Sequence, residues 1–161
     1  MTSLRHAEAG RAGATDLSPS GPARPLRVLV VDDHLLARCA IRWQLQEMPD
    51  LMVVGEAADG FEGVALAKTL SPDLVLMDIC MPGLDGFEAT RRITKESSRV
   101  HVIIVSSLDG ESYRKAARDA GAAAYLVKGK TIPHLAVAIQ QIFGGKRETR
   151  KGASAATLGA G

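Results

Sequence analysis

The chain has 161 residues, of which 46% are hydrophobic and 24% charged, an ordinary globular composition with room for about one domain. Lys and Arg number 20 and Asp and Glu number 18, a net charge of +2, and the positive excess lies near the two ends of the chain. A basic nucleic-acid-binding fold is therefore not indicated, and aromatic residues, at 4%, are too few for a base-stacking platform.

The two cysteines, Cys39 and Cys80, form no C-x-x-C pair and have no histidine at the spacing of a zinc site, which indicates a reduced setting. The apolar runs are much shorter than the roughly 20 residues needed to cross a bilayer. The N-terminus also lacks the apolar stretch of a signal peptide. We therefore expect a cytoplasmic protein without a membrane partner.

The two ends of the chain differ in composition from its middle. Residues 1–25 are rich in Ala, Gly, Ser and Pro, and residues 144–161 have the same character, so we expect both to be flexible extensions of a single domain over residues 26–143. The C-terminal extension carries a basic cluster at 146–151. Such a cluster is most simply a solvated segment, and the alternative is a docking or nucleic-acid-touching tail.

Between the ends, short apolar runs alternate with helical patterns. The runs are β-branched or Leu-rich and mostly continuous, which is typical of strands buried on both faces of a sheet. They are residues 27–31, 52–57, 74–78, 101–106 and 123–128. Helical spacing of apolar residues follows each run, at 35–48, 61–67, 86–93, 112–120 and 132–143, with Gly144 and Gly145 as the expected end of the last helix. Short right-handed crossovers then predict a doubly wound, five-stranded parallel α/β sheet.

The reactive edge of such a sheet lies at the carboxyl ends of its strands. Asp32 and Asp33 follow the first run, Asp78 ends the third, Ser106 ends the fourth and Lys128 ends the fifth. Two unit charges about 5 Å apart repel by roughly 3 kcal/mol at an effective dielectric constant near 20, and one lysine cannot balance three carboxylates. A hard divalent cation with oxygen ligands, Mg²⁺, fits this edge best.

A carboxylate beside a divalent cation, an ammonium and a hydroxyl is suited to covalent phosphoryl chemistry. Asp78 would be the nucleophile, the cations would take up charge on the phosphoryl oxygens, and Ser106 would donate a hydrogen bond to one of them. Pro82 and Gly83 keep the residues after Asp78 in a loop, whose backbone carbonyls can turn toward a cation.

Five stretches of the chain carry a resemblance to a known family. These stretches are LRVLVVDDHLLARCAIRWQL, EAADGFEGVALA, PDLVLMDICMPGLDGFEATRRI, VIIVSS and AYLVKG, and the match as a whole runs from about Leu26 to Phe143. They resemble the receiver domain of two-component response regulators, most closely the subgroup usually fused to a helix-turn-helix output domain. The resemblance implies a flavodoxin-like sheet with the strand order 2-1-3-4-5.

The resemblance also implies roles for the residues at the sheet edge. Asp78 would be the phosphoacceptor, loaded from a phosphohistidine of a sensor histidine kinase or phosphotransfer protein. Asp33 and Asp78 would bind Mg²⁺ directly, Asp32 would act through water, and Cys80 would contribute its backbone carbonyl. Lys128 would pair with the phosphoryl group.

The same resemblance implies a two-state switch. Ser106 would move toward the phosphoryl group and Tyr125 would rotate inward behind it, which would change the surface of the fourth helix, the fifth strand and the fifth helix. A downstream protein would read that surface, and a homodimer through it is possible. The chain would be a regulatory phosphoacceptor and not an enzyme with an external substrate.

Several residues depart from the family pattern. Cys80 and Leu108 are apolar at positions that set phosphoryl lifetime in the family, Gly129 replaces a frequent proline after Lys128, and Leu35 takes another place often held by proline. No output domain follows, so we expect a stand-alone receiver and no direct DNA binding. His34, beside the acid pair, is expected to face solvent in the first turn of the helix, and the alternative is a role as a metal ligand.

Three other functions compete with this interpretation. A phosphohydrolase would need a second acid two residues after Asp78, where the chain has Cys80. A flavin-binding module would need a first loop that cradles phosphate, which Asp32 and Asp33 would repel. A DNA-binding regulator would have to act through the basic C-terminal segment.

Overall fold

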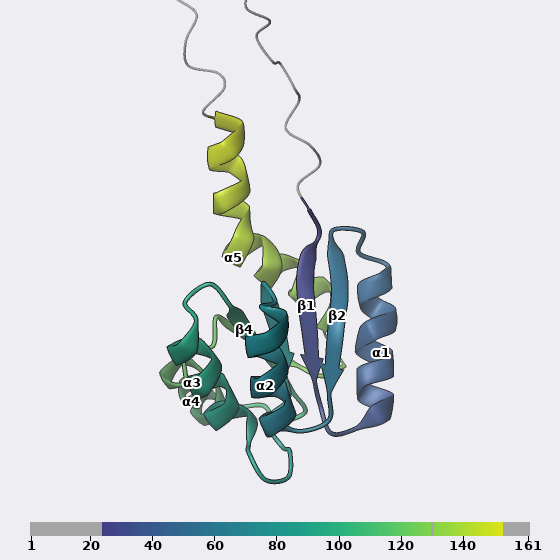
Figure 1. The fold of residues 1–161 in the computed structure, drawn as a ribbon, viewed down its shortest axis with the longest axis vertical. Helices are drawn as coiled ribbons and strands as arrows, with labels where there is room; N and C mark the ends of the chain where they lie inside the picture. The colour runs from purple at the N-terminus through teal and green to yellow at the C-terminus, as the bar shows by residue number, and fades with distance from the viewer. Residues whose placement is uncertain (1–23, 130, 153–161) are drawn as a thin grey trace, which may run out of the picture.

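The computed structural model describes residues 24–129 and 131–152, which form a parallel sheet with helices on both faces (Figure 1). Strands and helices alternate along the chain, and the strand order is β2-β1-β3-β4-β5, which confirms the predicted topology. The strands are β1 (Leu26–Val31), β2 (Leu51–Ala57), β3 (Leu74–Met77), β4 (His101–Ser106) and β5 (Ala124–Val127). The helices are α1 (Leu35–Gln46), α2 (Gly60–Leu70), α3 (Gly86–Glu96), α4 (Glu111–Asp119) and α5 (Thr131–Gly152).

The central strands are buried on both faces, as their continuous apolar sequences predict. All four residues of β3 and the last four of β1 are buried, and so are five of the six residues of β4. These strands cannot alternate polar and apolar residues, because helices cover both sides of the sheet. Each observed strand begins and ends within one residue of its predicted range.

The two faces of the sheet have separate cores. Ile41 and Leu45 of α1 pack with Leu135 and Ile139 of α5 against one face. The opposite face is covered by α2, α3 and α4, whose buried residues include Ala67, Ala89, Ile93 and Ala117. The doubly wound arrangement follows from this division, and it leaves the carboxyl ends of the strands open between the two helix layers.

The predicted end of the last helix is wrong. Gly144 and Gly145 do not terminate α5, which continues to Gly152. Glycine weakens a helix by about 1 kcal/mol relative to alanine but does not block it, and the residues that follow include good helix formers such as Lys146 and Arg147. Residues 153–161 of the predicted C-terminal extension lie outside the described residues, as do residues 1–23 of the N-terminal one. Within the described part of the chain, no helix is long and apolar enough to cross a membrane.

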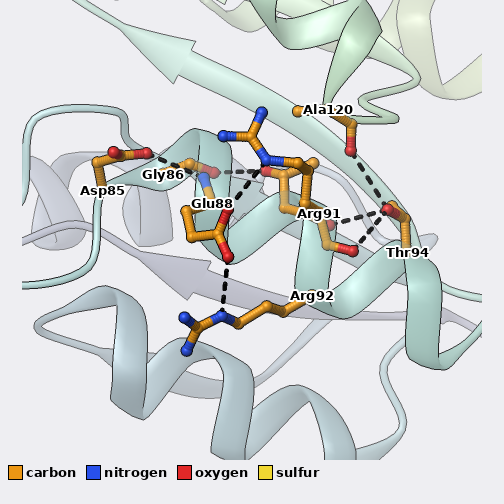
Figure 2. Close-up of polar contacts among 8 residues, drawn as sticks. Asp85, Gly86, Glu88, Arg91, Arg92, Thr94 and Ala120 are labelled. Carbon is orange, nitrogen blue, oxygen red and sulfur yellow. Dashed lines mark hydrogen bonds and ion pairs between the residues drawn. The ribbon is translucent and has the colours of Figure 1, made fainter.

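Helix α3 is tied down at both ends (Figure 2). At its start, the Asp85 carboxylate accepts a hydrogen bond of 2.9 Å from the backbone amide of Glu88, and Glu88 in turn pairs with Arg91 and Arg92. At its end, the Thr94 hydroxyl lies 3.3 Å from the backbone carbonyl of Ala120, just after α4. These contacts fix the position of α3, whose first residue abuts the polar edge of the sheet.

Candidate functional site

The backbone of the sheet places the polar residues of four strand ends side by side. The amide of Asp78 donates to the carbonyl of Val31 at 2.8 Å, which holds the ends of β3 and β1 together. The amide of Lys128 donates to the carbonyl of Ser106 at 2.8 Å, which does the same for β5 and β4. The edge expected from the sequence is therefore a continuous surface in space.

Lys128 joins the two most buried carboxylates of this edge. Its ammonium lies 2.6 Å from Oδ2 of Asp32 and 2.9 Å from Oδ1 of Asp78. Asp32 is 1% exposed and Asp78 is 4% exposed, whereas the Lys128 side chain keeps 23% of its surface in solvent. Charge-assisted hydrogen bonds compensate the cost of burying these acids.

The environment shifts the acid and the base in the same direction. Burial raises the pKa of Asp78 and the charge of Asp32 adds to this, while the Lys128 hydrogen bond opposes it without cancelling it. Burial alone would lower the pKa of Lys128, but its hydrogen bonds to Asp32 and Asp78 outweigh that effect, so the pKa is raised. Lys128 is therefore a firmly protonated cation beside a carboxylate that ionises less readily than a solvated one.

The remaining acid points to a cation site. Oδ1 of Asp33 is buried and accepts no hydrogen bond within the described residues, although Nδ1 of His34 lies 2.8 Å away. Asp32 has both oxygens engaged, since Oδ1 accepts from the backbone amide of His34 at 2.9 Å and Oδ2 from Lys128. An enclosed carboxylate oxygen with unused lone pairs is available to bind a cation.

The donors at this edge suit magnesium. Asp32, Asp33 and His34 offer ligand atoms within 4.8 Å of one another, and Oδ1 of Asp78 faces Lys128. Three carboxylates and one ammonium leave a negative excess, and carboxylate oxygens are hard ligands. The His34 side chain is 74% exposed, as predicted, and its Nδ1 lies 2.8 Å from Oδ1 of Asp33.

The loop after Asp78 is anchored by its apolar residues. Ile79, Met81 and Leu84 are buried, whereas Cys80 is exposed. The amide of Gly86 donates to the carbonyl of Ile79 at 3.0 Å. A Cβ at Gly86 would lie 1.9 Å from the backbone oxygen of Asp78, so only glycine permits α3 to begin this close to the acid.

Ser106 and Tyr125 are connected through one loop residue. Ser106 is 1% exposed, and its hydroxyl accepts a hydrogen bond of 3.3 Å from the amide of Leu108. The carbonyl of Leu108 accepts a hydrogen bond of 2.8 Å from the hydroxyl of Tyr125. Burial raises the pKa of Tyr125, in keeping with an enclosed hydroxyl. The Ser106 hydroxyl therefore bonds to the β4–α4 loop and also interacts with the hydroxyl of Tyr125.

Two supporting residues were missed in the sequence. Arg38 donates to the backbone carbonyl of Asp32 at 2.6 Å and pairs with Glu56 at 3.3 Å. Arg42 pairs with the same carboxylate at 2.8 Å. Nothing in the local sequence sets Glu56 apart from other charged residues, and only the packing of α1 against β2 brings the three together.

This fold and this edge define a class of protein, and the chain belongs to the response regulator receiver domain family, which residues 28–140 match. It is 40% identical over 122 residues to the response regulator GacA of Pseudomonas aeruginosa, a match that covers 76% of this chain and 57% of that protein. It is 43% identical over 115 residues to the transcriptional regulatory protein LiaR of Bacillus subtilis, covering 71% of this chain and 54% of that protein.

Solved structures agree with the family. The response regulator domain of CheB from Thermotoga maritima superposes with a TM-score of 0.69 at 36% identity, covering 75% of this chain and 98% of that one. The receiver domain of the putative response regulator NarL from Mycobacterium tuberculosis gives 0.71 at 32% identity, covering 76% and 99%. The chain spans about half the length of the curated relatives it matches, and one of those is a transcriptional regulator. The expected lack of DNA binding therefore stays a prediction.

Proposed function

We propose that this protein accepts a phosphoryl group on Asp78 from a phosphohistidine of a sensor histidine kinase or phosphotransfer protein. The observation that carries the proposal is the buried Asp78 carboxylate held 2.9 Å from the Lys128 ammonium, beside an acid pair on the neighbouring strand. The family of the chain supports it, because receiver domains are regulatory phosphoacceptors.

In the proposed reaction, an oxygen of Asp78 attacks the phosphorus atom, the bond from phosphorus to the donor's histidine nitrogen breaks, and that nitrogen leaves with the electron pair. Lys128 is placed to neutralise charge on the transferred group, and Ser106 would donate its hydroxyl hydrogen to a phosphoryl oxygen. Asp33 would hold Mg²⁺ together with Asp78 and the backbone carbonyl of Cys80, and Asp32 would act through water. When bound, the ion supplies positive charge to the phosphoryl oxygens.

Acceptance of phosphate is coupled in this proposal to the α4 and β5 surface. A phosphoryl group that draws the Ser106 hydroxyl would release the amide of Leu108, whose carbonyl binds Tyr125. The position of Tyr125 would then depend on whether Asp78 is phosphorylated, and a downstream protein or a second copy of the chain would bind the surface that this position changes. Self-dephosphorylation by water would reverse the switch.

Acetyl phosphate with Mg²⁺ tests the proposal. The purified protein is expected to gain one acid-labile phosphoryl group by intact mass, and Asp78→Asn is expected to gain none. Glu47→Gln, an exposed acid next to α1 and away from the sheet edge, serves as the control and should be labelled like the parent. An adduct that persists in Asp78→Asn, or no adduct in the parent, contradicts the proposal.

A further inference from the structure

An arginine of α4 lies over the ring of Tyr125. The Cζ atom of Arg114 is 5.1 Å from the ring centroid, a cation–π distance. The hydroxyl of the same tyrosine is bound on its other side to the carbonyl of Leu108. The ring is therefore held between the β4–α4 loop and a guanidinium group.

The arginine is itself anchored to the same loop. Its Nη2 atom lies 2.7 Å from Oδ1 of Asp109, and the amide of Gly110 donates to that carboxylate oxygen at 2.8 Å. Gly110, with φ of 139°, is the residue before α4 and takes a backbone conformation that favours glycine. Leu108 thus binds Tyr125 directly, and Asp109 holds it through Arg114.

Beside the ring there is space for a different position. A cavity of about 210 Å³ lies between α4 and β5, lined by Tyr125, Arg114, Arg118 and the small residues Ala117 and Ala122–Ala124. Alanine side chains leave room where larger ones would fill it. This cavity gives the phenol ring room to move, and Arg114 is one of the residues that line it.

We propose that Arg114 is a positioning residue that holds Tyr125 inward against Leu108 and so favours the arrangement that accepts phosphate on Asp78. The first part, that Arg114 holds Tyr125 inward, depends only on the contacts above. The second part, that this position favours phosphate on Asp78, rests on the proposed function. Removing the guanidinium takes away the contact on the outer face of the ring and also the link to Asp109. The ring then keeps a single hydrogen bond to the loop.

Fluorine NMR tests the first part in the unphosphorylated full chain. The chain has two tyrosines, so Tyr113→Phe leaves Tyr125 as the single site for 3-fluorotyrosine. In this background Arg114→Ala is expected to move the ¹⁹F resonance toward its solvent-exposed value, with a loss of about two- to fivefold in the inward-to-outward ratio, the size of an exposed cation–π contact. Arg114→Lys keeps the charge but not the planar stack, so its ¹⁹F resonance should lie between those of the parent and Arg114→Ala.

Two further variants make the test specific. Lys115→Ala removes an exposed cation of the same helix that pairs with Asp119 and does not line the cavity, and it should leave the resonance unchanged. Asp109→Asn keeps an oxygen for the amide of Gly110 but frees Arg114, so it should shift the resonance in the same direction as Arg114→Ala. Equal resonances for Arg114→Ala and Lys115→Ala would overturn the proposal.

The second part is read from the rate of labelling by acetyl phosphate. Arg114→Ala is expected to slow labelling by the same two- to fivefold, and Lys115→Ala to label at the parent rate. A shifted resonance with an unchanged rate would overturn the coupling to Asp78. If no variant is labelled and the parent is not labelled either, the proposed function has failed, and the resonance alone decides the role of Arg114.

Discussion

Lys128 and Asp32 are 96 residues apart in the chain, yet the ammonium of one donates a hydrogen bond of 2.6 Å to the carboxylate of the other. The lysine starts from the end of β5 and reaches past two strands to the end of β1. Because the same ammonium lies 2.9 Å from Asp78, one cation holds two buried acids in place. The stability of the site therefore depends strongly on Lys128.

Replacing Lys128 by methionine should lower the free energy of unfolding by about 3 kcal/mol at neutral pH, because it leaves two buried carboxylates without their cation. The loss should shrink as the pH falls. Asp78 has a folded pKa above its unfolded value, so the folded state takes up protons first, and stability declines as pH rises through that interval. Urea unfolding between pH 5 and pH 8 measures both effects.

The double variant Asp32→Asn with Lys128→Met is the control for this prediction, because it removes one charge of each sign and should recover part of the loss. Lys115→Met removes an exposed lysine of α4 that pairs with Asp119, and it should change stability little. A Lys128→Met protein as stable as the parent at neutral pH would show that the buried acids need no cation.

Gly86→Ala should destabilise the fold more than any other single methyl group added near the site. The new Cβ would lie 1.9 Å from the backbone oxygen of Asp78, so either α3 or the strand end must move. We expect a loss of about 3 kcal/mol, the upper range for overpacking, and a shift of amide resonances around Asp78. Gly144→Ala, inside α5, is the matched control and should stabilise by up to about 1 kcal/mol.

The strands and the polar edge could be predicted from the sequence because each depends on local pattern. The apolar run 74–77 is short and has turn residues on both sides, which favours a strand buried on both faces, and a parallel sheet then brings Asp78 beside Asp32 without any knowledge of side-chain conformation. The end of α5 was mispredicted since glycine permits more than one backbone state. Local sequence does not decide between them at Gly144.

Contacts between distant side chains could not be predicted in this way. The two oxygens of Asp32 are divided between Lys128 and the amide of His34, and this division depends on the rotamer that packing imposes. The position of Arg114 over Tyr125 depends likewise on the angle between α4 and β5. Such contacts are set by tertiary geometry, and residue spacing in the sequence does not predict them.

Asp73 should make stability fall at acid pH. Its carboxylate accepts two hydrogen bonds from Arg24, at 2.7 and 2.8 Å, and one from the amide of Arg27. Burial alone would raise the pKa of Asp73, but these partners outweigh it and the pKa is lowered. The contribution of the ionised Asp73 carboxylate to the free energy of unfolding is therefore present above the unfolded pKa of about 3.9. It is lost as pH falls through the lower folded pKa.

Asp73→Asn should accordingly be less stable than the parent by about 1 kcal/mol at neutral pH, and the two proteins should converge once the pH falls below the lowered folded pKa of Asp73. Urea titrations from pH 2 to pH 7 provide the measurement. Arg24→Ala should show a smaller version of the same pH dependence, since the amide of Arg27 remains. If the difference in the free energy of unfolding between Asp73→Asn and the parent stayed constant down to pH 2, this explanation would be ruled out.

Magnesium affinity should distinguish Asp33 from Cys80. Asp33 offers an enclosed oxygen without a hydrogen bond, so Asp33→Asn should weaken Mg²⁺ binding by about tenfold or more, the size expected from losing a charged ligand. The Cys80 side chain is exposed and only its backbone carbonyl is assigned to the ion, so Cys80→Ser should bind within about twofold of the parent. Isothermal titration calorimetry, with amide resonances of residues 32–34 as a second signal, measures both. If Cys80→Ser lost as much affinity as Asp33→Asn, the thiol itself would have to take part and the assignment of the carbonyl would be wrong.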